Sequence, residues 1–142
     1  MANADSKSDA HVSLPAVFAS LRHQFGSARG DYLYPRGIVG EQIGAALGIP
    51  APTLQLPDGN ALVSGCRPHS CDEKAAIIVA PDGTVFAAGL INFHCGARVC
   101  DAKPRLTIFV TRARAQPVLS QELQDWAARA ANVGVTETRL VP

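Results

Sequence analysis

The sequence predicts a single α+β domain: one antiparallel sheet of about five strands, with helices packed on one face. Apolar residues recur at helical spacing near both ends of the chain, whereas its middle holds apolar, β-branched segments separated by tight turns. Short turns favour antiparallel neighbours, because parallel strands need long crossover connections. The length of 142 residues fits one domain with a substantial core.

The helices are predicted from apolar spacing and end signals. Residues 1–12 are polar, and we expect a flexible N-terminus there, followed by a single domain over residues 13–142. Ser13 is a suitable N-cap for a first helix that ends before Gly26. Residues 38–47 predict a short second helix, although two internal glycines weaken this pattern.

The middle of the chain is predicted to be strands. Their expected positions are residues 53–56, 60–65, 74–80, 84–93 and 105–112. The tripeptide Pro-Asp-Gly occurs at residues 57–59 and 81–83 and is typical of a turn, since Pro sets the first φ angle and Gly accepts a left-handed conformation.

Three further predictions concern the rest of the chain. Gly89, inside a predicted strand, indicates a bulge or a point of close packing. A last helix is predicted from Ser120, its expected N-cap, to residue 131. Residues 135–142 then form a short edge strand or a frayed end.

Composition and motifs exclude several classes of function. The net charge is +1 and basic residues are scattered, so we expect no nucleic-acid partner. No apolar run approaches the roughly 20 residues of a membrane span. Phosphate-binding glycine loops, Gly-x-Ser-x-Gly and His-Glu-x-x-His are absent, and no two carboxylates stand out as an acid/base pair. We therefore expect a protein that is not an enzyme and that needs no cofactor.

The four cysteines form two pairs of equal spacing, Cys66/Cys71 and Cys95/Cys100. Such pairs indicate disulfides and an oxidising compartment. Local pairing is favoured among the three pairings that four cysteines allow. The alternative is a zinc-binding structural module built on four thiolates, although zinc ligand pairs are usually separated by two to four residues, which puts this spacing at the edge of the range.

The N-terminus is consistent with export. Ala2-Asn3-Ala4 has the form of a signal-peptidase site, but no apolar segment of a signal peptide accompanies it. We expect an exported protein whose signal peptide is absent from this sequence.

The most specific pattern is the segment Cys66-Arg67-Pro68-His69-Ser70-Cys71. A disulfide between its ends closes a ring with His69 near the tip and Pro68 stiffening it. The crosslink of so short a loop contributes only on the order of 2 kcal/mol. Its main effect is to fix a protruding shape, which lowers the ordering cost of binding. This segment resembles the Cys-Lys-Pro-His-Asp-Cys loop of the Ivy family, periplasmic bacterial inhibitors of C-type lysozyme, and the resemblance extends over about residues 50–112.

The resemblance implies a mechanism and a partner. In the family the loop enters the lysozyme cleft, where its histidine meets two catalytic carboxylates, and His69 stands at the matching position. Arg67 corresponds to the family lysine and is expected to reach an acidic rim. The expected partner is C-type lysozyme or another peptidoglycan hydrolase, met in the periplasm, with a homodimer left open.

Three differences from the family keep another function in view. Ser70 replaces an acidic residue, the chain is near neutral, and a second hairpin lies between Cys95 and Cys100. This hairpin either braces a long strand connection or forms a second contact arm with Arg98 near its tip. The alternative function is an immunity protein that neutralises a secreted peptidoglycan amidase or muramidase.

Overall fold

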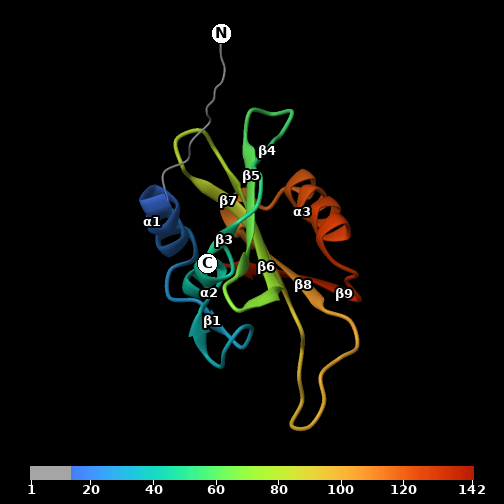
Figure 1. Ribbon diagram of the computed structural model, residues 1–142. Coiled ribbons are helices and arrows are strands. Elements are labelled where there is room, and N and C mark those ends of the chain that lie inside the picture. The colour runs from blue at the N-terminus through green and yellow to red at the C-terminus, as the bar shows by residue number, and fades with distance from the viewer. Residues whose placement is uncertain (1–13) are drawn as a thin grey trace.

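The computed structural model describes residues 14–142, so the predictions for residues 1–12 and for Ser13 lie outside the described residues. The chain is an α+β fold whose central sheet is flanked by α-helices (Figure 1). The helices are α1 (Leu14–Phe25), α2 (Val39–Ala45), the short 3-10 helix η2 (Arg112–Arg114) and α3 (Pro117–Ala130). The main strands are β3 (Ile49–Pro50), β4 (Leu54–Gln55), β5 (Ala61–Arg67), β6 (Ser70–Val79), β7 (Val85–Asn92), β8 (Arg105–Thr111) and β9 (Val135–Val141). A separate two-stranded sheet consists of β1 (Arg29–Gly30) and β2 (Gly37–Ile38).

The main sheet is mixed and seven-stranded, so the prediction of a five-stranded antiparallel sheet was wrong. Its order is β3-β5-β6-β7-β8-β9, and β4 pairs with the start of β5. The pairs from β3 to β8 are antiparallel, but β9 lies parallel to β8, with Arg105 opposite Val135. The reason is that α3 lies between these two strands, which makes their connection a crossover rather than a hairpin. The predicted edge strand at the C-terminus is confirmed as β9.

Helices cover both faces of the sheet, which corrects the prediction of one covered face. On one face α1 and α2 pack over alternate strand residues that include Ile77, Leu90 and Phe109. On the other face α3 packs over residues that include Ile78 and Ile108. A strand covered on both faces is apolar at successive positions, as residues 75–79 of β6 are.

The helix ends follow local signals, with one correction. The first helix ends at Phe25 as predicted, and Gly26 takes a φ of 55°. The last helix begins at Pro117 with Gln116 as N-cap, three residues before the predicted Ser120. Proline suits the first turn because its missing N–H would be unpaired there in any case. Ser120 lies inside the helix, where its Oγ accepts a hydrogen bond from Gln124 Nε2 at 3.1 Å.

The two Pro-Asp-Gly turns are confirmed. Gly59 and Gly83 have φ angles of 89° and 91°. Asp58 and Asp82 each accept a hydrogen bond from the backbone N–H two residues later, at 3.0 and 2.9 Å. Gly89 is a point of close packing, since a Cβ there would lie 3.3 Å from the Trp126 ring.

Candidate functional site

Both cysteine-containing loops leave the same end of the sheet, which we call the loop end. There β5 and β7 end, and β6 and β8 begin. The β5–β6 turn and the long β7–β8 connection therefore emerge side by side, whereas the Pro-Asp-Gly turns lie at the opposite end (Figure 1). The loop end is thus where this fold can present both stapled loops to one partner.

His69 occupies the tip of the first loop. Arg67 pairs with Ser70 across the hairpin, and Pro68 and His69 form the two-residue turn between them. Proline at the first turn position and a left-handed residue at the second are the pattern of a type II turn, and His69 has a φ of 66°. Pro68, His69 and Ser70 are all exposed. The backbone therefore holds the imidazole outward in a conformation that non-glycine residues seldom adopt.

The disulfide closes the hairpin where its pairing is irregular. Cys66 pairs with Lys74, but the next residue, Arg67, pairs with Ser70, so residues 71–73 have no partner on β5. The Cys66–Cys71 disulfide spans this irregularity, with a Cα–Cα distance of 4.8 Å. Cys66 is buried and Cys71 is exposed. One end of the crosslink is thus fixed in the core, and the other holds the unpaired stretch.

Two glycines let the neighbouring chain support the loop from below. A Cβ at Gly48 would lie 2.8 Å from Pro68 Cδ, so the proline ring packs directly on the backbone before β3. A Cβ at Gly65 would lie 2.5 Å from the carbonyl oxygen of Ile49. Both close approaches require the missing side chain.

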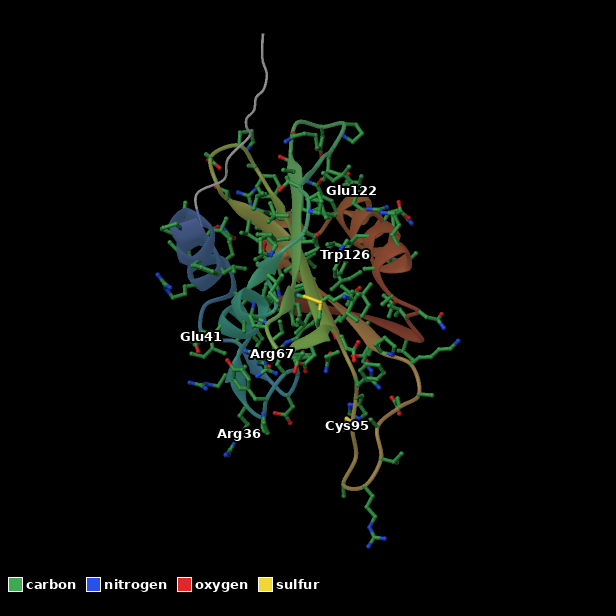
Figure 2. The ribbon with its side chains drawn as sticks, in the orientation of Figure 1. Arg36, Glu41, Arg67, Cys95, Glu122 and Trp126 are labelled. Atoms are coloured by element: carbon green, nitrogen blue, oxygen red, sulfur yellow. A yellow bond between two sulfur atoms is a disulfide. The ribbon has the colours of Figure 1, made fainter. Side chains whose placement is uncertain are left out.

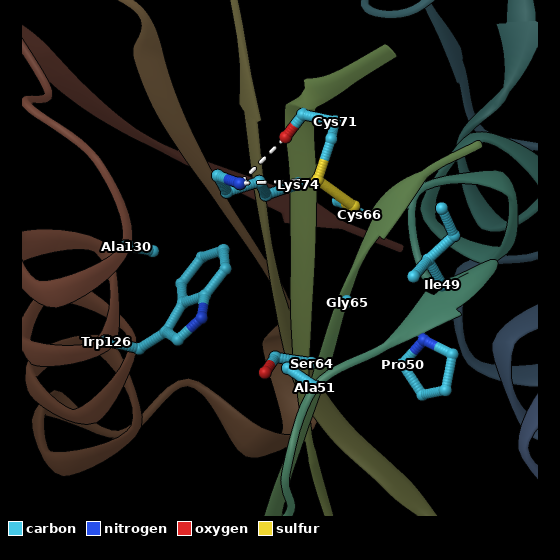
Figure 3. Close-up of a pocket in the computed structure, with 10 residues that line it drawn as sticks. All are labelled: Ile49, Pro50, Ala51, Ser64, Gly65, Cys66, Cys71, Lys74, Trp126 and Ala130. Atoms are coloured by element: carbon cyan, nitrogen blue, oxygen red, sulfur yellow. Dashed lines mark hydrogen bonds between the residues drawn. A yellow bond between two sulfur atoms is a disulfide. The ribbon is translucent and has the colours of Figure 1, made fainter. Parts of the chain in front are cut away.

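Polar contacts brace the loop from within. Arg67 forms an ion pair with Glu73 at 2.8 Å, and both side chains are partly buried. Lys74 Nζ donates to the Cys71 carbonyl at 2.7 Å (Figure 3). The Arg67 guanidinium, expected from sequence to reach a partner, is therefore turned onto Glu73 of its own hairpin.

Two hollows lie beside the base of the hairpin formed by β5 and β6. One, of about 230 Å³, lies between the disulfide and α3, and Figure 3 shows Trp126 on its helix side. The other, of about 320 Å³, lies between the loop that joins β1 to β2 and the end of β7, and Glu73 lines it. Its other lining residues are Asp31, Tyr32, Leu33, Tyr34, Pro35, Asn92, Phe93, His94 and Cys95. The hollows therefore lie beside the base of the hairpin, while its tip, Pro68 to Ser70, is exposed.

The buried side chain of Gln42, in α2, makes four hydrogen bonds to the loop that joins β1 to β2 and to the ends of these strands. Its Oε1 accepts from the backbone N–H groups of Leu33 at 2.7 Å and Tyr34 at 3.3 Å. Its Nε2 donates to the carbonyls of Gly30 and Gly37, each at 2.9 Å. All four hydrogen-bonding positions of the amide are thereby used, and this third loop becomes a rigid neighbour of the hollow.

The second stapled loop stands apart from the first. Cys95 and Cys100 form a disulfide and an isolated antiparallel bridge in the β7–β8 connection, and Figure 2 marks Cys95 on this projecting segment. Arg98 lies between them and is exposed. The structure thus brings together residues 66–71 as one loop, and places Arg98 on a separate hairpin at the same end.

Sequence reasoning missed several supporting residues. Glu73 and Gln42 carry no motif, because an ion pair and an amide network depend on contacts distant in the sequence. Gly48 had a detectable signal, since it follows a predicted helix, but its contact with Pro68 could not be read from that position. Gly65, directly before a cysteine in an apolar strand, is the type of glycine that marks close backbone approach.

The zinc alternative has no ligands of the expected kind. All four cysteines are disulfide-bonded, so none offers a thiolate. Within residues 14–142 no group of histidine, cysteine and acidic side chains is arranged to hold a metal ion. In the same part of the chain, no helix has the length and apolar character needed to cross a membrane.

Fold and site together define a small α+β scaffold that presents a disulfide-closed hairpin with an exposed histidine. Residues 42–105 match the family described as Inhibitor of vertebrate lysozyme (Ivy), which confirms the predicted resemblance. The match begins in α2, at Gln42, and ends at the first residue of β8, so it includes both stapled loops. No curated protein and no solved structure matches the chain significantly.

Proposed function

We propose that this protein is a periplasmic inhibitor of C-type lysozyme that inserts the 66–71 loop into the catalytic cleft. The observation that carries the proposal is the position of His69, exposed at the tip of a turn that a disulfide closes. The family match includes this loop and names lysozyme as the enzyme that the family inhibits.

The chemistry of the tip suits a cleft that contains two carboxylates. Glycosidases of this kind use one carboxyl group as acid and a second as nucleophile or base, about 5–9 Å apart. An imidazole has two ring nitrogens, and both donate hydrogen bonds when the ring is protonated. Placed between the carboxylates, His69 would fill the position of the sugar and form charge-assisted hydrogen bonds.

The supports around the loop favour a rigid plug. The disulfide, the Arg67–Glu73 ion pair and the packing of Pro68 on Gly48 all restrict the hairpin before any partner binds. Binding then loses little conformational entropy, which is the main gain from preorganisation. In this proposal Arg67 acts as a brace, and any contact with an acidic rim is secondary.

The test is lysis of bacterial cell walls by hen-type lysozyme, followed by turbidity, with and without the protein. Wild-type protein is expected to suppress lysis at micromolar excess, and His69→Ala is expected to lose most of this effect. His23→Ala is the matched control, because His23 is an exposed histidine on α1, outside the loop. If wild-type protein leaves lysis unchanged, the lysozyme target is wrong; if His69→Ala inhibits as well as wild type, the loop mechanism is wrong.

A second candidate is an immunity protein against a secreted peptidoglycan amidase or muramidase. The observation that favours it is charge: the chain has a net charge of +1, whereas steering toward a strongly basic lysozyme would favour an acidic inhibitor. The same scaffold would then plug a different cleft. The check is the same pair of histidine variants, assayed for protection against a purified amidase or muramidase in place of lysozyme.

A further inference from the structure

The β7–β8 connection is exposed along nearly its whole length. Every residue from His94 to Lys103 is exposed, and Val99 has 75% of its surface open to solvent. Among the exposed large apolar residues of the described chain, no other has so high a fraction. This segment therefore contributes little to the core.

The connection is nevertheless held in a fixed shape. The Cys95–Cys100 disulfide joins its two arms. Gly96 N donates to the Val99 carbonyl and Asp101 N donates to the His94 carbonyl, both at 2.9 Å. An ordered loop without buried contacts adds little to stability, but its ordering lowers the cost of binding a partner.

This hairpin projects farther than the loop that carries His69. Cys66, Lys74 and Ile91 lie in one row across β5, β6 and β7. From that row His69 is three residues away and Arg98 is seven, which at about 3.3 Å per residue allows reaches of roughly 10 and 20 Å. The two hairpins are separated by two strand spacings, about 10 Å. Figure 1 shows the same relation, with the β7–β8 connection extending well beyond the β5–β6 turn at the loop end.

We propose that the Cys95–Cys100 hairpin is a second binding arm, which lies against the flank of the enzyme whose cleft receives the 66–71 loop. This inference rests on the proposed function. An enzyme that takes in the shorter loop to the depth of His69 must meet a longer rigid hairpin beside it. The hairpin then either contacts the rim of the cleft or prevents docking, and only the first outcome is compatible with inhibition.

The side chains at the tip define the surface they fit. Val99 offers an exposed apolar side chain and the adjacent Arg98 a guanidinium with five donors. The matching surface is an apolar patch with a carboxylate next to it, on the rim of the target cleft. Arginine is among the residues that most often carry a large share of the energy in such contacts, and the Val99 side chain would add buried apolar area beside it.

The experiment measures the affinity for hen-type lysozyme by calorimetry, using wild-type protein, Val99→Asp and Arg98→Ala. The matched control is Val118→Asp, because Val118 is 50% exposed at the start of α3, beyond the opposite end of β8. We expect Val99→Asp to raise the Kd at least tenfold, Arg98→Ala to raise it several-fold, and the control to change it less than twofold. Hydrogen exchange of residues 93–104 should slow when lysozyme is added.

The outcomes separate this inference from the function on which it rests. If wild-type protein binds lysozyme and His69→Ala weakens binding, but Val99→Asp behaves like Val118→Asp and residues 93–104 gain no protection, the second arm is refuted and the plug remains. If wild-type protein does not bind lysozyme, the proposed function is refuted and the second arm with it. Circular dichroism of each variant shows that a lost affinity does not come from unfolding.

Discussion

The turn geometry of His69 allows stability and inhibition to be separated by two substitutions at one position. His69 has a φ of 66°, in the left-handed region. Glycine adopts this conformation without a steric penalty, whereas alanine retains its Cβ and pays about 1 kcal/mol. His69→Gly should therefore be more stable than His69→Ala by about 1 kcal/mol, or roughly 3 °C in Tm for a chain of this size. Thermal unfolding by circular dichroism measures this difference.

Both variants remove the imidazole, so both should lose inhibition. Loss of charge-assisted hydrogen bonds in a closed interface costs about 2–4 kcal/mol, which corresponds to a roughly 30- to 1000-fold rise in the inhibition constant. His69→Gly should thus be the more stable of the two variants, although neither should inhibit the enzyme. Equal stability of the two would refute the turn assignment, and retained inhibition in both would refute the role of the imidazole.

Three further predictions concern the scaffold. Gly65→Ala should lower the free energy of unfolding by about 1–3 kcal/mol, measured in urea, because its Cβ would meet a backbone carbonyl of β3. Gln42→Leu should lower it by about 3 kcal/mol, since four backbone groups lose their partner, and should speed hydrogen exchange in residues 29–38. Burial, and then the charges of Asp58 and Asp125, raise the pKa of Glu122. When folding raises the pKa of a carboxyl group, the protonated form of that group favours the folded state. This stability is lost as the pH rises through the pKa of the folded state. Glu122→Gln should therefore have a higher free energy of unfolding than wild type at pH 7, and this gain should fade as the pH falls toward 4.5; a gain that is constant with pH would contradict this.

The position of Glu122 makes it suitable for the last of these tests. Figure 2 shows it on α3, well away from the labelled Cys95 at the loop end. Glu122→Gln should accordingly leave lysozyme inhibition unchanged. A change in inhibition with this variant would indicate a binding surface other than the loop end.

Local patterns were enough to predict most elements of the fold. The positions of β5 to β8 followed from apolar segments bounded by turns, and both Pro-Asp-Gly turns follow from backbone preferences alone. The errors came from contacts between distant segments. The parallel pairing of β9 depends on α3 crossing the sheet, and neither β-propensity nor a turn signal encodes that path. One signal was available: residues 75–79 are apolar without alternation, which is typical of a strand covered on both faces.

The candidate site likewise has a part that local sequence patterns predict and a part that depends on contacts between distant segments. The two disulfides follow from the spacing of the four cysteines, and the exposed tip with its histidine follows from the six residues 66–71. The brace between Arg67 and Glu73 could not be predicted, because the register shift in β6 decides which side chains meet. The relative reach of the two hairpins likewise depends on strand register, which only the structure provides.

The central claim is that the 66–71 loop occupies the lysozyme cleft, and competition with a cleft-filling sugar tests it most directly. The measurement is the Kd between this protein and hen-type lysozyme, with and without a saturating chitin oligosaccharide. If the loop takes the place of the sugar, the two compete for one site. The apparent Kd between the two proteins should then rise in proportion to the oligosaccharide concentration, once that concentration exceeds the Kd of the oligosaccharide for lysozyme. An unchanged Kd at saturation would show that protein and sugar bind together, and would contradict the account.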